Sequence, residues 1–184
     1  MAKLACLLTN GFEDIEALGT VALLRRANID VDFIGAMDEQ TVTGTFKTRI
    51  MVDRPLKALD VTYYDGIFIP GGKQAYVLAE DPRVLQWVHT FHDQGKWLFA
   101  ICAAPIVLGV QGLLKGKKYI SFPGTQAQIH GGIRVDAPVA VDGKIITAIG
   151  AGAVYEFAFA IVEHMLGTEA MNDLKKRILY RAFA

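Results

Sequence analysis

Hydrophobic and polar positions along the chain follow two alternating patterns. Short, nearly continuous apolar runs end at glycine, proline, asparagine or aspartate, which is typical of strands buried on both faces of a parallel sheet. These runs predict strands at residues 3–8, 30–34, 66–69, 97–101 and 119–122. Between them, apolar residues recur at helical spacing and predict helices at residues 13–27, 82–94, 103–110, 153–166 and 169–180.

Two further segments have the pattern of hairpins. Residues 42–52 alternate partly and contain a turn at Gly44, and residues 139–149 contain an Asp142-Gly143 pair, which favours a tight turn. The overall alternation predicts an α/β fold, in which a mostly parallel sheet carries helices on both faces. No linker or internal repeat divides the chain, so we expect one domain over residues 1–184.

Composition narrows the class of protein. The chain has 19 Lys plus Arg and 19 Asp plus Glu, and this balance, without a basic stripe, argues against nucleic-acid binding. No apolar run is long enough for a membrane helix, and the N-terminus lacks the layout of a signal peptide, so we expect a cytoplasmic protein. In a reducing compartment, Cys6 and Cys102 are expected to be free thiols.

We expect functional residues directly after the predicted strands, because ligands in open α/β sheets bind at the carboxyl ends of the strands. Cys102 follows the 97–101 run and precedes a helix, so we expect it on a tight strand-to-helix turn. There the positive end of the helix favours a thiolate and predicts a lowered thiol pKa. The alternative is a buried structural cysteine, and Cys6, in the middle of a strand, fits that alternative.

Carboxylates and glycines follow two other strands. Glu13, Asp14 and Glu16 open the first helix, where the helix dipole alone favours acids. Only Glu16 lies next to an apolar helix face, so its carboxyl could point into the cleft and exchange a proton with the thiol. Gly71 and Gly72 offer backbone N–H groups to an anion, although a simple turn is the commoner reason for such a pair.

The histidines give no strong metal signal. His89 and His92 lie three residues apart on a predicted helix, and the polar residues around them indicate a solvated face rather than a metal site. His130 lies in a loop from which it could reach the cleft. We therefore expect no metal. The chain also lacks the glycine motifs of dinucleotide and phosphate binding and the elbow of serine hydrolases.

Three stretches together resemble the ThiJ/PfpI superfamily, whose flavodoxin-like fold is shared with the class I glutamine amidotransferases. The stretches are Gly11-Phe-Glu-Asp-Ile-Glu16, Ile69-Pro-Gly-Gly72 and Ala100-Ile-Cys-Ala-Ala-Pro105. The similarity runs from about residue 3 to residue 167 and looks strongest to the branch that contains the parkinsonism-associated protein deglycase. This resemblance implies a three-layer sandwich with a nucleophile elbow at the cysteine.

The resemblance also implies roles for individual residues. Cys102 matches the family nucleophile, and Glu16 matches the acid whose carboxyl hydrogen bonds to the thiolate. Gly72 and Ala103 match residues whose backbone N–H groups line the pocket, with Gly71 beside them. The chemistry of such a site needs a nucleophile, an acid/base and oxyanion donors, so we expect no cofactor.

Three other positions bear on the comparison with the family. Arg26 and Arg49 fall where some relatives place arginines near the dimer interface and the pocket mouth, and members are commonly homodimers. Phe122 stands where some relatives carry a histidine. Because phenylalanine cannot take a proton, a Cys-His-acid triad is not expected here, and Glu16, water or His130 would have to transfer protons.

The resemblance implies a stress-response protein that acts as a cofactor-independent glyoxalase or protein deglycase. In this reading the Cys102 thiolate attacks methylglyoxal or its adducts on proteins. An alternative is a redox-sensing or chaperone-like homodimer whose Cys102 is oxidised to a sulfinate. A further alternative, an intracellular cysteine peptidase or amidase, is disfavoured by Phe122.

Overall fold

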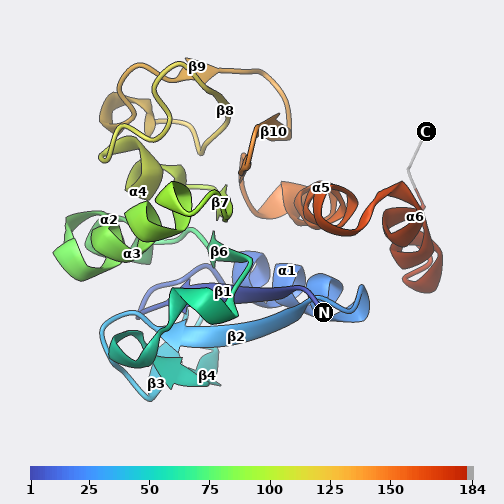
Figure 1. Cartoon of the computed structure of the whole chain (residues 1–184), viewed down its shortest axis with the longest axis horizontal. Coiled ribbons are helices and arrows are strands. Elements are labelled where there is room, and N and C mark those ends of the chain that lie inside the picture. Colours follow the sequence, from blue (N-terminus) through green and yellow to red (C-terminus); the bar gives the residue numbers. More distant parts are fainter. Residues whose placement is uncertain (182–184) are drawn as a thin grey trace.

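A seven-stranded, mostly parallel sheet forms the centre of the molecule in the computed structural model, which describes residues 1–181 (Figure 1). Residues 182–184 lie outside the described residues. The order of the strands is β10-β11-β7-β6-β1-β2-β5, and only β10 runs antiparallel to its neighbour. The strands are β1 (Lys3–Leu8), β2 (Asp30–Gly35), β5 (Arg54–Pro55), β6 (Gly66–Ile69), β7 (Trp97–Ile101), β10 (Val139–Asp142) and β11 (Ile145–Ala148).

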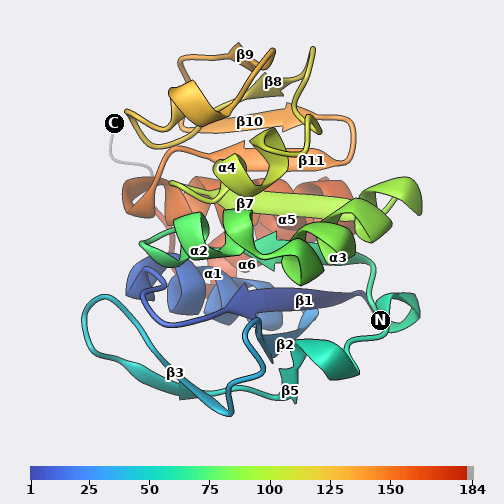
Figure 2. The ribbon, with the colours of Figure 1, turned by 90° about the vertical axis from the view of Figure 1, so that its left-hand side faces the viewer.

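Helices cover both faces of this sheet, as Figure 2 shows. On one face lie α2 (Gln74–Glu80), α3 (Pro82–Asp93) and α4 (Pro105–Gly109). On the other lie α1 (Asp14–Arg26) and α5 (Val154–Leu166), with α6 (Thr168–Arg177) packed against α5. The parallel strands follow the flavodoxin order 2-1-3-4-5 when they are counted along the chain from β1 to β11, without the short β5. The predicted α/β three-layer fold is therefore confirmed.

The alternation of side chains along each central strand divides the core in two. In β1, Leu4, Cys6 and Leu8 pack with the α1 and α5 side chains, whereas Ala5 and Leu7 pack with those of α3 and α4. All five side chains are fully buried, which explains why the run reads as continuously apolar. Cys6 is therefore a structural core residue, as its place in the strand predicts.

Capping residues start two of the helices where the sequence predicts. The Glu13 side chain accepts the N–H of Glu16 at 2.7 Å and caps α1. The Asp81 side chain accepts the N–H of Arg83 at 2.8 Å and caps α3, with Pro82 at the first helical position. Both predicted hairpins are present, as β3 (Thr41–Thr43) with β4 (Arg49–Met51), and as β10 with β11.

Two predicted elements differ from the structure. The strand expected at residues 119–122 is only β8 (Lys118–Tyr119), which pairs with β9 (Ile133–Arg134) outside the central sheet. The next residue, Ile120, donates its N–H to the Thr147 hydroxyl at 2.9 Å, so a side chain replaces the strand partner that the chain would need to continue. The helix expected at residues 103–110 is shortened to α4, because residues 102–104 form a turn.

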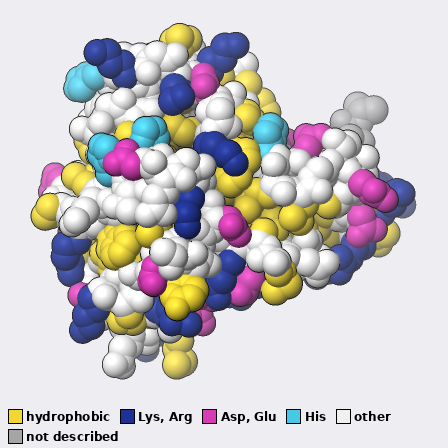
Figure 3. Space-filling view, in the orientation of Figure 1, with side chains coloured by type: hydrophobic (Ala, Val, Ile, Leu, Met, Phe, Trp, Pro, Cys, Tyr) yellow, Lys and Arg dark blue, Asp and Glu magenta, His cyan; other side chains and the backbone are white. Residues whose placement is uncertain are grey.

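The remaining elements are short. Helix α2 was not predicted from the sequence; it begins one residue after the Pro70-Gly71-Gly72 turn, with Lys73 as its N-cap. The described part of the chain also contains four 3-10 turns, η1 (Leu56–Ala58), η2 (Val61–Tyr63), η3 (Gln126–Gln128) and η4 (Ala151–Ala153). Within residues 1–181, none of the helices has the length and apolar character needed to cross a bilayer. Basic and acidic side chains are interspersed over the face shown in Figure 3.

Candidate active site

Three strand ends meet at the switch point of the sheet, where β1 lies between β2 and β6. Helix α1 follows β1 and carries Glu16, and the turn after β6 contains Gly71 and Gly72. The neighbouring strand β7 ends at Ile101, immediately before Cys102. Parallel strands place all these residues along the same edge of the sheet, as the sequence predicts.

Cys102 adopts a left-handed backbone conformation, with φ of +63°. Such a conformation is unfavourable for a residue other than glycine, and it persists here because backbone hydrogen bonds hold both the N–H and the carbonyl of Cys102. The Cys102 N–H donates to the carbonyl of Ala148 at 2.9 Å, and the Cys102 carbonyl accepts the N–H of Phe122 at 2.7 Å. Cys102 is only partly buried, so it is not sealed inside the core.

Glu16 is almost completely buried, with 1% of its surface exposed, in the first turn of α1. One carboxyl oxygen, Oε2, accepts the N–H of Gly71 at 2.8 Å, and the Ala151 N–H also hydrogen bonds to the carboxyl. The same carboxyl hydrogen bonds to the thiol of Cys102. Glu16 is thus oriented from two sides by backbone groups and faces the sulfur directly.

The two glycines after β6 allow this close approach. A Cβ on Gly71 would lie 2.6 Å from the Cβ of Cys102 and 2.6 Å from Oε2 of Glu16, which no side chain could tolerate. Gly72 has a φ of +84° and forms an antiparallel bridge with Phe12. The N–H groups of Gly72 and Ala103 hydrogen bond to the sulfur and thereby lower the thiol pKa.

Burial dominates the electrostatics of the pair. It raises the pKa of Glu16 to about 7, and hydrogen bonds from Cys102, Gly71 and Ala151 limit the shift. Burial, together with the charge and hydrogen bond of the Glu16 carboxylate, raises the pKa of the Cys102 thiol to about 12. Two adjacent negative charges in a partly dry site are costly, so the thiol and the carboxyl share protons and titrate as one coupled system.

The lowered thiol pKa expected from the sequence is therefore not what the structure shows. The expectation relied on the positive end of a helix beginning directly after Cys102, but α4 begins only at Pro105 and has five residues. Burial and the neighbouring carboxylate outweigh the N–H groups of Gly72 and Ala103. A thiolate at this position requires that Glu16 carry the proton, so the two residues have to be considered together.

Phe122 and Gly150 lie beside Cys102 and Glu16 and form the remaining side of the site. A methyl group on Gly150 would lie 3.8 Å from Cδ2 of Phe122, 4.0 Å from Sγ of Cys102 and 4.0 Å from Oε1 of Glu16. The sulfur, the carboxyl and the aromatic ring therefore lie around one position above the Gly150 backbone, which we call the hollow above Gly150. Phe122 is 51% exposed, so its ring forms an outer wall of this hollow rather than part of the core.

The other residues suggested by the sequence lie elsewhere. His130 is exposed, in a turn where the adjacent Gly131 approaches Lys115 beyond the far end of α4, and the described contacts of Cys102 and Glu16 do not include it. Arg26 lies at the C-terminal end of α1, where its carbonyl accepts a hydrogen bond from Arg177. Since Glu16 is at the other end of this helix, Arg26 is roughly 15 Å along the helix axis from the carboxyl.

Arg49 is exposed on the hairpin formed by β3 and β4, which packs beside the start of α1. The Asp14 carboxylate fixes the tip of this hairpin by accepting the N–H groups of Phe46 at 2.9 Å and Thr48 at 3.2 Å. Burial alone would raise the pKa of Asp14, but the hydrogen bonds from Thr48 and Phe46 outweigh it and lower that pKa. Asp14 is therefore a structural residue that connects the hairpin to α1.

Two supporting residues were not foreseen from the sequence. The Ala151 N–H orients Glu16, but an alanine in a Gly150-Ala-Gly152 turn carries no signal of such a role. Gln74 is fully buried, and its amide accepts the N–H of Thr9 at 2.8 Å and donates to the carbonyl of Pro70 at 2.9 Å. It thereby connects the ends of β1 and β6, from which the Glu16 and Gly71 segments begin.

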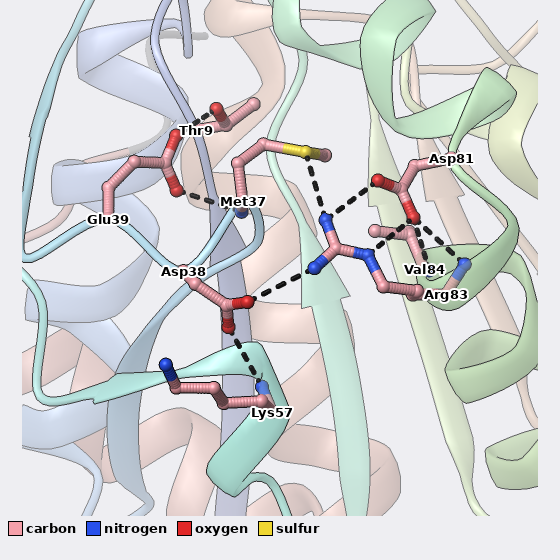
Figure 4. Close-up of polar contacts among 8 residues, drawn as sticks. All are labelled: Thr9, Met37, Asp38, Glu39, Lys57, Asp81, Arg83 and Val84. Carbon is pink, nitrogen blue, oxygen red and sulfur yellow. Dashed lines mark hydrogen bonds and ion pairs between the residues drawn. The ribbon is translucent and has the colours of Figure 1, made fainter.

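A polar network that does not include Cys102 or Glu16 connects other residues at the same edge of the sheet (Figure 4). The Arg83 guanidinium lies between Asp81, at 2.9 Å, and Asp38, at 3.1 Å. Asp38 and Glu39 belong to the loop after β2, and Glu39 hydrogen bonds to the Thr9 hydroxyl at the end of β1. This network connects α3 to the ends of β1 and β2 without contacting the thiol.

One group of residues in the described part of the chain could supply three metal ligands. His89, His92 and Asp93 at the end of α3 have ligand atoms within 4.8 Å of one another, and all three are at least partly exposed. Because α3 leads into the start of β7, the group lies at the opposite edge of the sheet from Cys102. The solvated face predicted for these histidines thus has no part in the site.

Comparison with known proteins relates nearly the whole chain to one family. The profile described as DJ-1/PfpI family matches residues 2–164. Among solved structures, a mutant of the DJ-1 superfamily protein STM1931 from Salmonella typhimurium superposes with a TM-score of 0.91 at 33% identity. The alignment covers 99% of this chain and 100% of that one.

Curated relatives have names from several classes of activity. Glutathione-independent glyoxalase DJR-1.2 of Caenorhabditis elegans is 33% identical over 89% of this chain and 88% of its own. Deglycase PH1704 of Pyrococcus horikoshii is 28% identical, over 79% and 89%. YraA of Bacillus subtilis, whose name describes a cysteine protease, is 32% identical, over 79% and 88%. The chain spans only 40% of the longer Protein DJ-1 homolog B of Arabidopsis thaliana, at 32% identity.

Proposed function

The chain belongs to the DJ-1/PfpI family, and from this premise we propose that it is a cofactor-independent glyoxalase or deglycase that uses Cys102 as its nucleophile. The names of its relatives are consistent with an enzyme of this family. The observation that carries the proposal is the hydrogen-bonded pair of Cys102 and buried Glu16, with backbone N–H groups directed at both. Such a site combines a nucleophile with an acid/base.

The reaction converts an α-oxoaldehyde such as methylglyoxal and one water into a 2-hydroxy acid. Sγ of Cys102 bonds to the aldehyde carbon, and the aldehyde oxygen takes a proton, which gives a hemithioacetal. Glu16 removes the hydrogen from that carbon as a proton and returns it to the adjacent carbonyl carbon. The hydroxyl of the hemithioacetal gives its proton to the oxygen of that carbonyl, which becomes a hydroxyl. The product is a thioester of Cys102. Water then cleaves the carbon–sulfur bond, releasing lactate and restoring the thiol.

The geometry supports this division of roles. A Glu16 pKa of about 7 allows the carboxyl to accept and to donate a proton near neutral pH, which is the requirement for general acid–base catalysis. The N–H groups of Gly72 and Ala103, which favour negative charge at the sulfur, can also stabilise the oxyanion formed during attack. For a deglycase, the same thiol would attack the adduct that the aldehyde forms on a protein amine or thiol.

The test is a lactate assay with purified protein and methylglyoxal. Wild type and Cys6→Ser are expected to form lactate at equal rates, whereas Cys102→Ser is expected to be inactive. Glu16→Gln is expected to lose at least about 100-fold in kcat, since general acid–base groups typically contribute that much. Lactate formation that survives Cys102→Ser would show that the thiol is not the nucleophile.

A second function, redox sensing, uses the same thiol. The N–H groups of Gly72 and Ala103 and the protonated form of Glu16 are positioned to hydrogen bond to the oxygens of a Cys102 sulfinate. Peroxide treatment is expected to add two oxygens to the peptide that contains Cys102 and none to that of buried Cys6. Oxidation of Cys6 first would contradict this function. A peptidase remains disfavoured, because Phe122 and Glu16, rather than an imidazole, face the sulfur at the Gly150 hollow.

We further propose a homodimer in a reducing, cytoplasmic compartment. Large apolar side chains are exposed near the start of α1 and on the neighbouring hairpin: Ile15, Phe46 and Met51 are 59%, 70% and 81% exposed. Burial of such side chains is a driving force for association. Light scattering after size exclusion should give twice the 20.1 kDa of the chain, and Ile15→Lys with Phe46→Glu should shift it to the monomer. A wild-type monomer would refute the proposal.

A further inference from the structure

The hollow above Gly150 has one chemically distinct side. Cys102 Sγ and Glu16 Oε1 each lie 4.0 Å from the position that a Gly150 methyl would occupy, and these two groups carry the proposed chemistry. The third neighbour of that position is Cδ2 of Phe122, at 3.8 Å, which belongs to an apolar ring without an acidic proton. A small molecule in this position therefore has reactive groups on one side and an aromatic ring on the other.

Phe122 is held in place by its backbone. Its N–H donates to the carbonyl of Cys102 at 2.7 Å, so the backbone that carries the ring cannot separate from the elbow without loss of that bond. Its carbonyl accepts the hydroxyl of Thr125 at 2.7 Å, and that hydroxyl also hydrogen bonds to buried Ser121 at 2.8 Å. The ring itself is 51% exposed, which leaves apolar area available to a ligand.

Gly150 leaves this space open although the backbone does not demand glycine there. Its φ of 161° and ψ of −171° are those of extended backbone, which any residue can adopt. The nearest atoms to an added methyl are at 3.8 Å, an ordinary van der Waals distance. An alanine would therefore fit without displacing the protein, and its methyl would occupy the space that a substrate needs.

We propose that the hollow binds the substituent of the α-oxoaldehyde against Phe122, and that the enzyme selects substrates with an apolar, above all an aryl, substituent. This inference rests on the proposed function, and it names the substrate class of the same site. When the aldehyde carbon lies next to Sγ, the substituent on the adjacent carbon is placed next to the Phe122 ring. An aryl group stacks there, whereas an anionic substituent would face Glu16 without a hydrogen-bond donor on Phe122.

The test compares glyoxal, methylglyoxal and phenylglyoxal, whose substituents are hydrogen, methyl and phenyl. Intrinsic reactivity cancels when the ratio of kcat/KM for phenylglyoxal over glyoxal in a variant is divided by that of wild type. Phe122→Ala is expected to lower the ratio about tenfold or more, the scale on which apolar contacts discriminate between substrates. Phe122→Leu, which keeps an apolar side chain, is expected to lie between the two. An unchanged ratio in Phe122→Ala would overturn the inference.

A second readout does not depend on turnover. Alkylation of Cys102 by iodoacetamide is compared with alkylation by its N-benzyl derivative, and the adduct is located by peptide mass. Phe122→Ala is expected to remove most of the wild-type preference for the benzyl reagent. Gly150→Ala is expected to slow the benzyl reagent at least tenfold, while Gly152→Ala, where a methyl meets nothing within 4 Å, is expected to match wild type. Equal rates in Gly150→Ala and wild type would overturn the inference.

The two proposals can fail separately. If wild type converts none of the three aldehydes, the proposed activity is wrong, and the alkylation ratios alone decide whether Phe122 forms an apolar binding wall. If wild type converts them and Phe122→Ala leaves both the kinetic and the alkylation ratios unchanged, the activity stands and the role of Phe122 is refuted. Thermal melting of each variant against wild type shows that the fold is retained.

Discussion

The carboxyl of Glu16 hydrogen bonds to the thiol of Cys102, although one residue lies in the first turn of α1 and the other follows β7. The contact exists because β1, β6 and β7 are adjacent in the sheet and end at the same edge. This contact excludes water from the carboxyl and from the thiol, and burial is the largest influence on the pKa of each. The protonation of one group therefore governs the other.

Glu16 should make the stability of the protein depend on pH. Its pKa is about 7 in the folded state against 4.5 for an exposed glutamate, so between these values the folded state binds more protons than the unfolded state. The free energy of unfolding therefore falls as pH rises through this range. Because one pKa unit corresponds to about 1.4 kcal/mol, the expected loss is about 3 kcal/mol.

Urea denaturation of wild type and Glu16→Gln at pH 4.5, 6 and 8 measures this effect. The stability of the variant relative to wild type should increase by about 3 kcal/mol from pH 4.5 to pH 8. Glu80→Gln removes a carboxylate from an exposed position on α2 and controls for the loss of one negative charge. Parallel pH profiles for wild type and Glu16→Gln would contradict the buried, proton-binding carboxyl.

The two cysteines should differ sharply in reactivity. Cys6 is fully buried in β1, and burial raises its pKa well above that of a free thiol, whereas Cys102 is partly exposed. Iodoacetamide at neutral pH should modify Cys102 at least about 100-fold faster than Cys6, because only the former is reached without unfolding. Peptide mass analysis separates the two sites. In folded Cys102→Ser no labelling is expected, and 6 M urea should then expose Cys6; rapid labelling of Cys6 in the native state would refute this assignment.

Gly71 should tolerate no side chain. A Cβ there would lie 2.6 Å from the Cys102 Cβ and 3.0 Å from the carbonyl oxygen of Ile101, so Gly71→Ala has to separate the thiol from the carboxyl. We expect a loss of about 1–3 kcal/mol in stability and of roughly 100-fold in kcat/KM for methylglyoxal. Gly152→Ala is the matched control, since its methyl meets nothing within 4 Å. Equal activity of the two variants would show that the close approach at Gly71 is not needed.

Asp14 should control the mobility of the hairpin beside the site. Asp14→Ala leaves the N–H groups of Phe46 and Thr48 without their acceptor, at a cost of about 1–3 kcal/mol. Hydrogen exchange should accelerate at these two amides in the variant and remain unchanged at the central strand β6. In wild type the same amides should lose protection in acid, because the lowered pKa of Asp14 stabilises the fold at neutral pH and this contribution disappears as the carboxylate is protonated.

The sequence predicts the central part of this fold well because buried parallel strands have a distinctive pattern. β1, β6 and β7 fall where continuous apolar runs end at turn residues. The run at residues 119–122 has the same appearance, but Ile120 bonds to a threonine side chain and the strand stops at Tyr119. Whether an apolar run joins a sheet depends on partners distant in sequence, and these partners are not visible in a local pattern.

The site was predictable only in part for a similar reason. Cys102, Glu16 and Gly72 could be named from their positions after strands and from a resemblance, but the distances and pKa values depend on how far the turn at Gly71 lets the strands approach. Ala151 orients Glu16 through its backbone N–H alone, and Gln74 connects the strand ends because its side chain is completely buried. Neither role can be inferred from the residue type. The raised thiol pKa follows from burial, which a sequence does not quantify.

The buried amide of Gln74 has a consequence for how such proteins diversify. Since it joins the ends of β1 and β6, it fixes the segment that leads to Glu16 against the glycine turn at Gly71. The aromatic ring of Phe122 extends from a different segment, whose backbone hydrogen bonds to Cys102 and Thr125. The side chain at position 122 can therefore change during evolution, and with it the preferred substrate, while Glu16 and Cys102 stay in place.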